Sequence, residues 1–209
     1  MAHLDRADPR IYAFIMYYRA FLHALHLQYD LALDEAYLAQ RVSLSHPSFR
    51  LYTQRLIIIV TLLLGQTPSR SLFNDPLIKA NLSPFYSQLV VSVHSQSIES
   101  YNALLSNEDA ILVFQNDCLY TLITRLRPII LRYSLQRLLT VYERVPLEFI
   151  QKKLQLPTLS QAHALFSKTI ADGYIEASID ENNIITVAQK IDQKLLAKQQ
   201  QYHLIKRIE

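Results

Sequence analysis

Two histidines in the first strongly apolar segment have a spacing that could bind a metal ion. His23 and His26 lie three positions apart, which on a helix places both imidazoles on one face. A metal site needs further ligands, however, and the sequence nearby offers no third ligand, only a surrounding rich in aromatic residues. We therefore expect structural or surface histidines, with no metal and no other cofactor.

Other residues with chemical potential are also poorly arranged for catalysis. Asp34 and Glu35 are adjacent, as are Glu108 and Asp109, and adjacent residues on a helix point in different directions, so neither pair forms a carboxylate dyad. The single cysteine, Cys118, has no histidine at a known catalytic spacing, and we expect an inert, buried or half-buried thiol. The chain has only two glycines, which argues against a glycine-rich phosphate loop. The sequence predicts a protein that is not an enzyme.

A basic cluster lies in the second half of the chain, in a stretch whose only acids are Glu143 and Glu148. It comprises Arg125, Arg127, Arg132, Arg137, Arg144, Lys152 and Lys153. Such a cluster could hold nucleic-acid phosphates. The helix expected at 160–173 contains no arginine for reading base edges, so we favour arginines that pack internally or meet acidic neighbours in an assembly.

The composition bounds the class of protein. The chain has 209 residues, half of them apolar, and a net charge of +3, which fits one domain or two small ones packed together. The segment nearest to a membrane span, 56–64, is about half the length that a span requires. The start of the chain lacks the apolar core of a signal peptide, and one cysteine forms no internal disulfide. We expect a cytoplasmic and nuclear protein that does not bind membranes.

Helical periodicity dominates the first two thirds of the chain. Pro84 is expected to interrupt one helix or to start a new one, and Pro128 to kink or divide another. Short connections indicate a helical-repeat bundle. The helices expected are 11–29, 30–42, 49–64, 77–93, 97–105, 108–114 and 117–142.

The period changes after residue 146. A short helix begins at Pro146, and a second helix follows with Ser160 as its candidate N-cap and Gly173 just past its end. Alternation of apolar and polar residues over 175–180 and from 185 to 187, around a polar turn at 181–183, predicts a β-hairpin. Two helices followed by a hairpin indicate a winged helix.

The hairpin and the tail are the expected contact surfaces. Ser178 and Thr186 are polar residues without charge, which would let another strand pair with the sheet. That strand could come from a partner or from the chain itself. The tail is expected to form an amphipathic helix whose apolar residues, among them Ile191, Leu195 and Tyr202, need a covering surface.

The chain resembles the PCI-domain family, found in the proteasome lid, the signalosome and a translation initiation factor, and most of all its branch of lid subunit 3. The resemblance runs from about Tyr17 to Val187. Members are longer, so we expect a fragment or a reduced form that corresponds to their carboxy-terminal part. Four segments carry the resemblance to this family: 60–68 (VTLLLGQTP), 120–127 (YTLITRLR), 142–147 (YERVPL) and 170–180 (IADGYIEASID).

The resemblance implies a mainly α fold: a TPR-like helical-repeat part at 1–127, a winged-helix part at 128–187 and a tail helix at 188–209. It implies a non-catalytic scaffold of the proteasome regulatory particle lid, in a hetero-oligomer with other PCI subunits. The alternatives are a signalosome subunit and a nucleic-acid-binding PCI protein of messenger-RNA export. The expected structural pivots are Arg125, Arg127, Asp172, Gly173 and Glu176, with the two acids as the nearest partners for the arginines.

Overall fold

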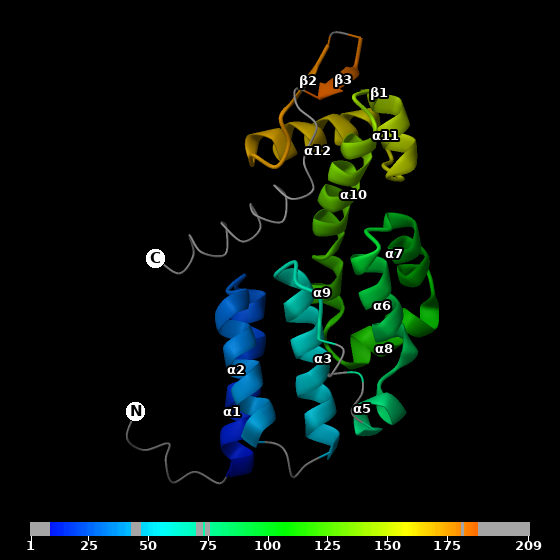
Figure 1. Cartoon of the computed structure of the whole chain (residues 1–209). Coiled ribbons are helices and arrows are strands. Elements are labelled where there is room, and N and C mark those ends of the chain that lie inside the picture. Colours follow the sequence, from blue (N-terminus) through cyan, green and yellow to red (C-terminus); the bar gives the residue numbers. More distant parts are fainter. Residues whose placement is uncertain (1–8, 43–46, 70–72, 74–75, 181, 188–209) are drawn as a thin grey trace. The chain divides into compact units, whose positions relative to one another are not determined.

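The computed structural model describes residues 9–42, 47–69, 73, 76–180 and 182–187. They fall into two compact units, one ending at Ile130 and the other beginning at Leu131, inside helix α10. The first unit is helical, and the second is a winged helix (Figure 1). This confirms the predicted fold class of a helical bundle followed by a winged helix with a small sheet.

The helices of the first unit follow the predicted pattern, but two of the expected helices are divided: the one over 77–93, where Pro84 starts a new helix, and the one over 117–142. They are α1 (Pro9–Leu25), α2 (Tyr29–Val42), α3 (Pro47–Leu63), α5 (Pro76–Asn81), α6 (Pro84–His94), α7 (Ile98–Leu105), α8 (Glu108–Asn116), α9 (Tyr120–Thr124) and the start of α10 (Arg127–Val141). None of the helices among the described residues has both the length and the apolar character needed to cross a membrane.

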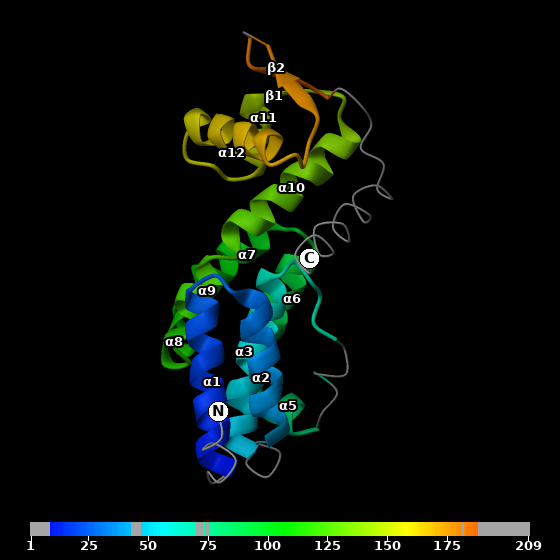
Figure 2. The same cartoon turned by 90° about the vertical axis from the view of Figure 1, so that its left-hand side faces the viewer.

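Alanine dominates the buried faces of α1 and α2. Ala13, Ala20 and Ala24 of α1 are buried, and so are Ala32, Ala36 and Ala39 of α2. These small side chains allow two helix backbones to approach closely. The two helices lie side by side in Figure 2, joined by a tight turn in which Leu27 has a positive φ of 66°.

Helix α3 is the centre of the first unit. Every residue from Leu56 to Leu63 is buried, which explains why the sequence here is apolar on all sides of the helix instead of on one stripe. Gly65 follows with a φ of 75°, the left-handed conformation that commonly ends a helix.

The helix expected over 117–142 is divided in two. Its first part, α9, ends at Thr124, and α10 begins at Arg127, so that Pro128 occupies the first turn of α10, where its missing N–H disrupts no helical hydrogen bond. Cys118 lies in the turn before α9 with a φ of 59°, and it is exposed. The expectation of a buried or half-buried thiol that opens a helix was wrong, because the left-handed residue stands outside the helix.

The winged helix consists of the rest of α10, α11 (Leu147–Lys153), α12 (Leu159–Ala171) and a sheet of β1 (Arg144–Pro146), β2 (Ala177–Ile179) and β3 (Ile184–Val187). The strand order is β1-β3-β2, all antiparallel, with Val145 opposite Ile185 and Ile185 opposite Ile179. Val145 and Ile185 are buried and anchor the inner face of the sheet. The third strand is therefore supplied by the chain itself.

The N-cap of α12 differs from the expected one. Thr158, not Ser160, has the extended backbone of a cap, and its Oγ1 accepts a hydrogen bond from the amide of Gln161 at 3.3 Å. Starting the helix at Leu159 adds this residue to the apolar side formed by Ala162 and Phe166, which are buried.

Candidate protein-interaction site

The pairing of β2 with β3 decides which main-chain groups of β2 are available. The amide of Asp180 donates to the carbonyl of Ile184 at 3.0 Å. In an antiparallel ladder such hydrogen-bonded pairs recur at every second residue, so the next is Ser178 with Thr186. The amides and carbonyls of Ala177 and Ile179 therefore point away from β3, toward an edge where no other strand of the described residues pairs.

The opposite edge of the sheet is less suited to accept a strand. The amide of Val187 donates to the carbonyl of Glu143 at 3.0 Å, and the same alternation directs the main chain of Arg144 and Pro146 outward. Proline has no N–H, so this edge lacks a donor at one of its two outward positions. The edge of β2 is the more complete template for another strand.

The two polar positions singled out in the sequence have different places in this sheet. Ser178 is exposed and lies in the edge strand β2. Thr186 lies in the central strand β3, between Arg144 of β1 and Ser178 of β2. Of the two sources of a pairing strand that the sequence left open, the chain itself supplies the one beside Thr186, because β1 and β2 occupy both sides of β3.

Gly173 and Tyr174 set the course of the chain into β2. Gly173 follows α12 with a φ of 73°, and its amide donates to the carbonyl of Ile170 at 2.8 Å. The guanidinium of Arg132 lies 4.4 Å from the centre of the Tyr174 ring, and Nε2 of Gln136 donates to the Tyr174 carbonyl at 3.2 Å. Two residues of α10 thus hold the segment that leads to the edge strand.

The acidic pivots do not pair with arginines as expected. Asp172 caps the end of α12, and both Asp172 and Glu176 are exposed. Among the described residues neither forms an ion pair with an arginine. Arg132 instead lies over the Tyr174 ring, because an aromatic face next to α10 offers the guanidinium a contact that needs no carboxylate.

Arg125 binds the end of a helix. Its Nη1 donates to the carbonyls of Ala24 and Leu25, at 3.1 and 3.0 Å, and these are the last residues of α1. The final carbonyls of a helix lack helical partners and carry partial negative charge, so a guanidinium satisfies them well. Arg125 is a structural residue of the first unit, which fits the internal alternative for this part of the basic cluster.

Arg127 is the exposed first residue of α10 and lies near Tyr101. Burial raises the pKa of Tyr101, and the positive charge of Arg127 opposes that shift. The hydroxyl of Tyr101 donates to the carbonyl of Ile123 at 2.9 Å, so it ties α7 to α9.

A charged cluster that the sequence did not predict joins three parts of the first unit. Nη1 of Arg55, in α3, lies 2.5 Å from Oδ1 of Asp117, and the hydroxyl of Tyr86, in α6, donates to Oδ2 of the same carboxylate at 2.6 Å. Burial, the hydrogen bond to Asp117 and its negative charge together raise the pKa of Tyr86. The three residues are 31 and 62 positions from one another along the chain, so no local pattern could have revealed the cluster.

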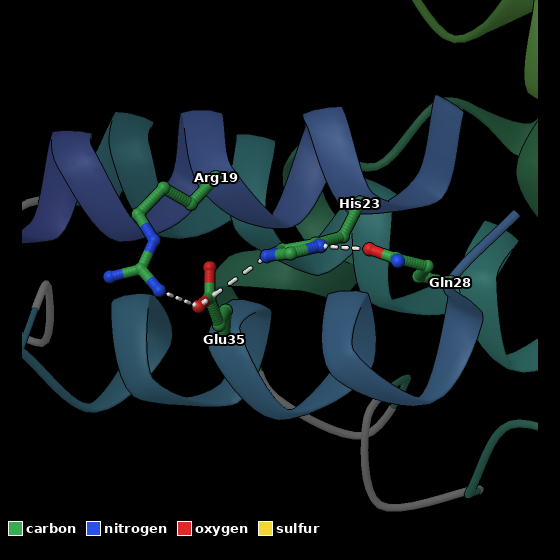
Figure 3. A network of polar contacts seen from close by, with 4 residues as sticks. All are labelled: Arg19, His23, Gln28 and Glu35. Carbon is green, nitrogen blue, oxygen red and sulfur yellow. Dashed lines mark hydrogen bonds and ion pairs between the residues drawn. The ribbon is translucent and has the colours of Figure 1, made fainter. Parts of the chain in front are cut away.

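Of the two histidines, His23 lies in α1 and His26 in the turn that follows it. The ring of His23 lies between Gln28 and Glu35, with Nδ1 at 2.6 Å from Oε1 of Gln28 and Nε2 at 3.8 Å from the carboxylate, while Arg19 pairs with Glu35 at 2.5 Å (Figure 3). His26 is exposed. In the described part of the chain, no three side chains of His, Cys, Asp or Glu are grouped to hold a metal ion.

Three of the expected contact residues, Ile191, Leu195 and Tyr202, lie outside the described residues. The structure therefore gives no account of the predicted tail helix.

Comparisons with known proteins agree with this architecture. A model of the PCI domain matches residues 108–190, and a model described as PSMD3-like, N-terminal TPR repeats matches residues 4–90. Over 84% of its own length, the chain is 32% identical to the probable 26S proteasome non-ATPase regulatory subunit 3 of Drosophila melanogaster. Over 90% of its own length, it is 30% identical to the 26S proteasome non-ATPase regulatory subunit 3 of Dictyostelium discoideum. It is 31% identical to the Anopheles gambiae protein over 79%.

The chain spans only about a third of the length of these relatives, between 33% and 38% of each. The two family models nevertheless match most of the chain, in the order helical repeats and then PCI domain. This order is also that of the helical unit and the winged helix in the structure. The chain thus contains, in this order, a segment similar to PSMD3-like N-terminal TPR repeats and a segment similar to the PCI domain.

Proposed function

We propose that this chain is a non-catalytic scaffold subunit of the 26S proteasome regulatory particle lid. It joins other PCI subunits of a hetero-oligomer through the edge of its winged helix and through its carboxy-terminal segment. The similarity to regulatory subunit 3 of several organisms supports the assembly, and the outward main chain of β2 is the observation that supports the mode of contact.

The edge of β2 suits a partner strand. An added strand binds through main-chain hydrogen bonds, and at this edge Ala177 and Ile179 each offer one amide and one carbonyl. The strand itself, ASI, carries no charge that would repel an approaching chain. A partner that pairs here would extend the three-stranded sheet to four strands.

The bonding of the arginines favours a protein partner over nucleic acid. Arg125 is bound to the carbonyls that end α1, and Arg132 lies over the Tyr174 ring. Phosphate binding depends on cations that can reach the backbone of the nucleic acid. Each of these two side chains makes a contact inside its own unit, Arg125 with the end of α1 and Arg132 with the segment that leads to β2.

Proline at position 177 tests the edge contact. Ala177→Pro removes an outward N–H and leaves the internal pair of Ser178 with Thr186 intact, so the chain should stay folded but lose its partners. The tagged chain is purified from its native cells, and the subunits that come with it are identified by mass spectrometry. Ser178→Ala, which leaves all main-chain groups in place, is the control and should assemble normally.

Two outcomes of this experiment speak against the proposal. Recovery of signalosome or export proteins with the wild-type chain would reject the proteasome assignment. Recovery of lid subunits with Ala177→Pro in normal amounts, at an unchanged thermal midpoint, would reject the edge contact alone.

Truncation after Val187 tests the second contact. The apolar residues of the tail, such as Ile191 and Leu195, need a covering surface, and a partner bundle would provide it. The truncated chain should then unfold at nearly the same urea concentration as the full chain while failing to join the assembly. A truncated chain that unfolds contradicts the partner bundle, because it shows that the tail is buried in its own domain, where each lost side chain costs about 2–5 kcal/mol. A truncated chain that still assembles normally contradicts the partner bundle as well.

A further inference from the structure

The outer face of the winged-helix sheet carries a row of three polar side chains, one from each strand. Arg144 of β1 lies opposite Thr186 of β3, and Thr186 lies opposite Ser178 of β2. Because side chains alternate between the two faces of a sheet, these three lie on the face away from the buried Val145 and Ile185. The Cα atoms of Arg144 and Ser178 are therefore about 10 Å apart, two strand spacings. We call these three residues the outer row of the sheet.

Two members of the outer row have polar groups that are not satisfied. Arg144 is exposed, and among the described residues it forms no ion pair. The hydroxyl oxygen of Thr186 is buried and has no hydrogen-bond partner. A buried polar group without a partner is costly, and each one in a native structure requires an explanation. An anion at the third position of the row, that of Ser178, would accept hydrogen bonds from both side chains.

Ser178 itself can carry that anion, because it is an exposed hydroxyl between two acids. Glu176 and Asp180, two positions before and after it, are also exposed, and this spacing places them on the same face as Ser178. Some protein kinases select serines that are flanked by acidic residues. Ser106 also has acids nearby, but its hydroxyl already donates to the carbonyl of Asn102 at 2.9 Å. Ser178 is therefore the better acceptor of a phosphate.

We propose that Ser178 is phosphorylated by an acid-directed protein kinase and that Arg144 and Thr186 of the outer row hold the phosphate. In this reaction Oγ of Ser178 attacks the γ-phosphorus of ATP, the bond from that phosphorus to the bridging oxygen breaks, and ADP leaves. The hydroxyl proton passes to the carboxylate base of the kinase. A guanidinium binds a phosphate through two parallel N–H groups, and the hydroxyl of Thr186 donates a third hydrogen bond.

The phosphate would regulate the edge of β2, and this part of the inference rests on the proposed function. The strand carries no charge of its own, but a phosphate adds about 1.5 to 2 negative charges between Glu176 and Asp180. A partner strand would bring its side chains within about 5.5 Å of those of β2, where like charges directly opposite each other weaken the pairing. The phosphorylated chain therefore accepts a partner strand less readily than the unmodified chain.

Treatment of the full chain with casein kinase II, an acid-directed kinase, and ATP tests the site. Phosphate should appear at Ser178, as located by mass spectrometry, and Ser178→Ala should lose this signal. Glu176→Gln combined with Asp180→Asn should slow the reaction at Ser178 by about tenfold, because two charge contacts with the kinase are lost. Ser167, exposed next to Lys168 on α12, is the internal control and should stay unmodified. Absence of phosphate at Ser178 would overturn the inference.

Phosphorus NMR of the phosphorylated chain tests whether the outer row holds the phosphate. A guanidinium next to the phosphate favours its doubly charged form, so Arg144→Gln should move the titration of the phosphate to higher pH by about half a unit. Thr186→Val should move it in the same direction by less. Lys153→Gln, which removes an exposed cation of α11, is the control and should leave the titration unchanged. An unchanged titration in Arg144→Gln would show that the row does not bind the phosphate.

Purification of tagged variants from native cells tests the regulation. Ser178→Glu, which adds a permanent negative charge, should recover lid subunits about fivefold less than Ser178→Ala, at an unchanged thermal midpoint. Equal recovery by the two variants would reject the regulation of the edge. If the wild-type chain recovers no lid subunits at all, the proposed function fails. The kinase reaction and the NMR titration use the chain alone, so they decide on the phosphate site in either case.

Discussion

Arg55 and Asp117 lie 62 positions apart in the sequence, yet their ion pair, with Tyr86 added, joins α3, α6 and the turn after α8. Arg125 similarly reaches the end of α1 from about 100 residues away. The helical unit is thus fixed by polar contacts between segments that are remote in sequence. Each of these contacts places a charge or a hydroxyl where water is largely excluded.

The turns and caps of the winged helix are built differently. The N-cap of α12 joins residues three positions apart, Gly173 ends the same helix by its own backbone conformation, and the hairpin closes with a bond from Asp180 to Ile184. Each device needs only a few consecutive residues. A change to one of these remote contacts of the helical unit should therefore affect segments far from it in the sequence, whereas a change to a turn or cap of the winged helix acts where it is made.

The largest effect is expected from Asp117→Ala. This change leaves the Arg55 guanidinium, whose side chain is 16% exposed, without its carboxylate, and it removes the acceptor of the Tyr86 hydroxyl. Removing one partner of a mostly buried ion pair should lower the free energy of unfolding by about 3 kcal/mol. Urea denaturation followed by circular dichroism measures the change.

The matched control is Tyr86→Phe, which removes one hydrogen bond and keeps the ion pair. It should cost about 1 kcal/mol. If both variants lose the same free energy of unfolding, the ion pair of Arg55 and Asp117 contributes nothing to stability. The contrast between remote and local contacts then fails for the helical unit.

Alkaline pH should destabilise the helical unit. Burial, with smaller contributions from Cys118 and other neighbouring groups, raises the pKa of Tyr17 to about 12. An unfolded tyrosine loses its proton near pH 10, so between about pH 10 and 12 the unfolded chain binds fewer protons than the folded one. The stability is therefore complete below pH 10 and falls as the pH rises toward 12.

Tyr17→Phe isolates this contribution. As the pH rises from about 9.5 to 12, the free energy of unfolding of the variant should fall by about 2 kcal/mol less than that of the wild type, as judged from urea midpoints. Tyr18→Phe, at an exposed position of the same helix, is the control and should follow the wild type. Identical pH profiles for Tyr17→Phe and the wild type would show that the phenol titrates normally in the folded chain.

A smaller and local effect is expected at Gly173. Its φ of 73° is a conformation that residues with a Cβ resist, and a Cβ placed here meets nothing within 4 Å. Gly173→Val should thus cost about 1–2 kcal/mol through backbone strain alone. Gly173→Asn, which tolerates this conformation better, should cost less; equal thermal midpoints for all three proteins would mean that the strain is absent.

The sequence predicted the parts that depend on local patterns. The apolar residues of α3, the glycine after α12 and the restart of a helix at Pro84 each follow from a few neighbouring residues, and the structure confirms them. The fold class followed from these elements together with the resemblance to the PCI family.

The remainder depends on which segments meet in space. Thr186 lies in β3, which pairs with β2 on one side and with β1 (Arg144–Pro146) on the other, so that β3 is the central strand. No residue near Thr186 in the sequence indicates the pairing with β1. Likewise, the sequence offered Asp172 and Glu176 as partners for the arginines, but among the described residues neither acid pairs with an arginine, and Arg132 lies over an aromatic ring. The edge that is available for a partner could be identified only from the register of the three strands.

The smallest effect is expected where two candidate caps lie close together. Thr158 accepts the Gln161 amide through Oγ1, so Thr158→Ala should lower the free energy of unfolding by about 1 kcal/mol. Ser160 lies inside the first turn, where alanine is the better helix former, so Ser160→Ala should be neutral or slightly stabilising. Thr158→Ser keeps an acceptor oxygen and should stay close to the wild type. The urea midpoints rank the three variants by stability. A greater loss of stability for Ser160→Ala than for Thr158→Ala would indicate that Ser160 is the N-cap and that α12 begins two residues later.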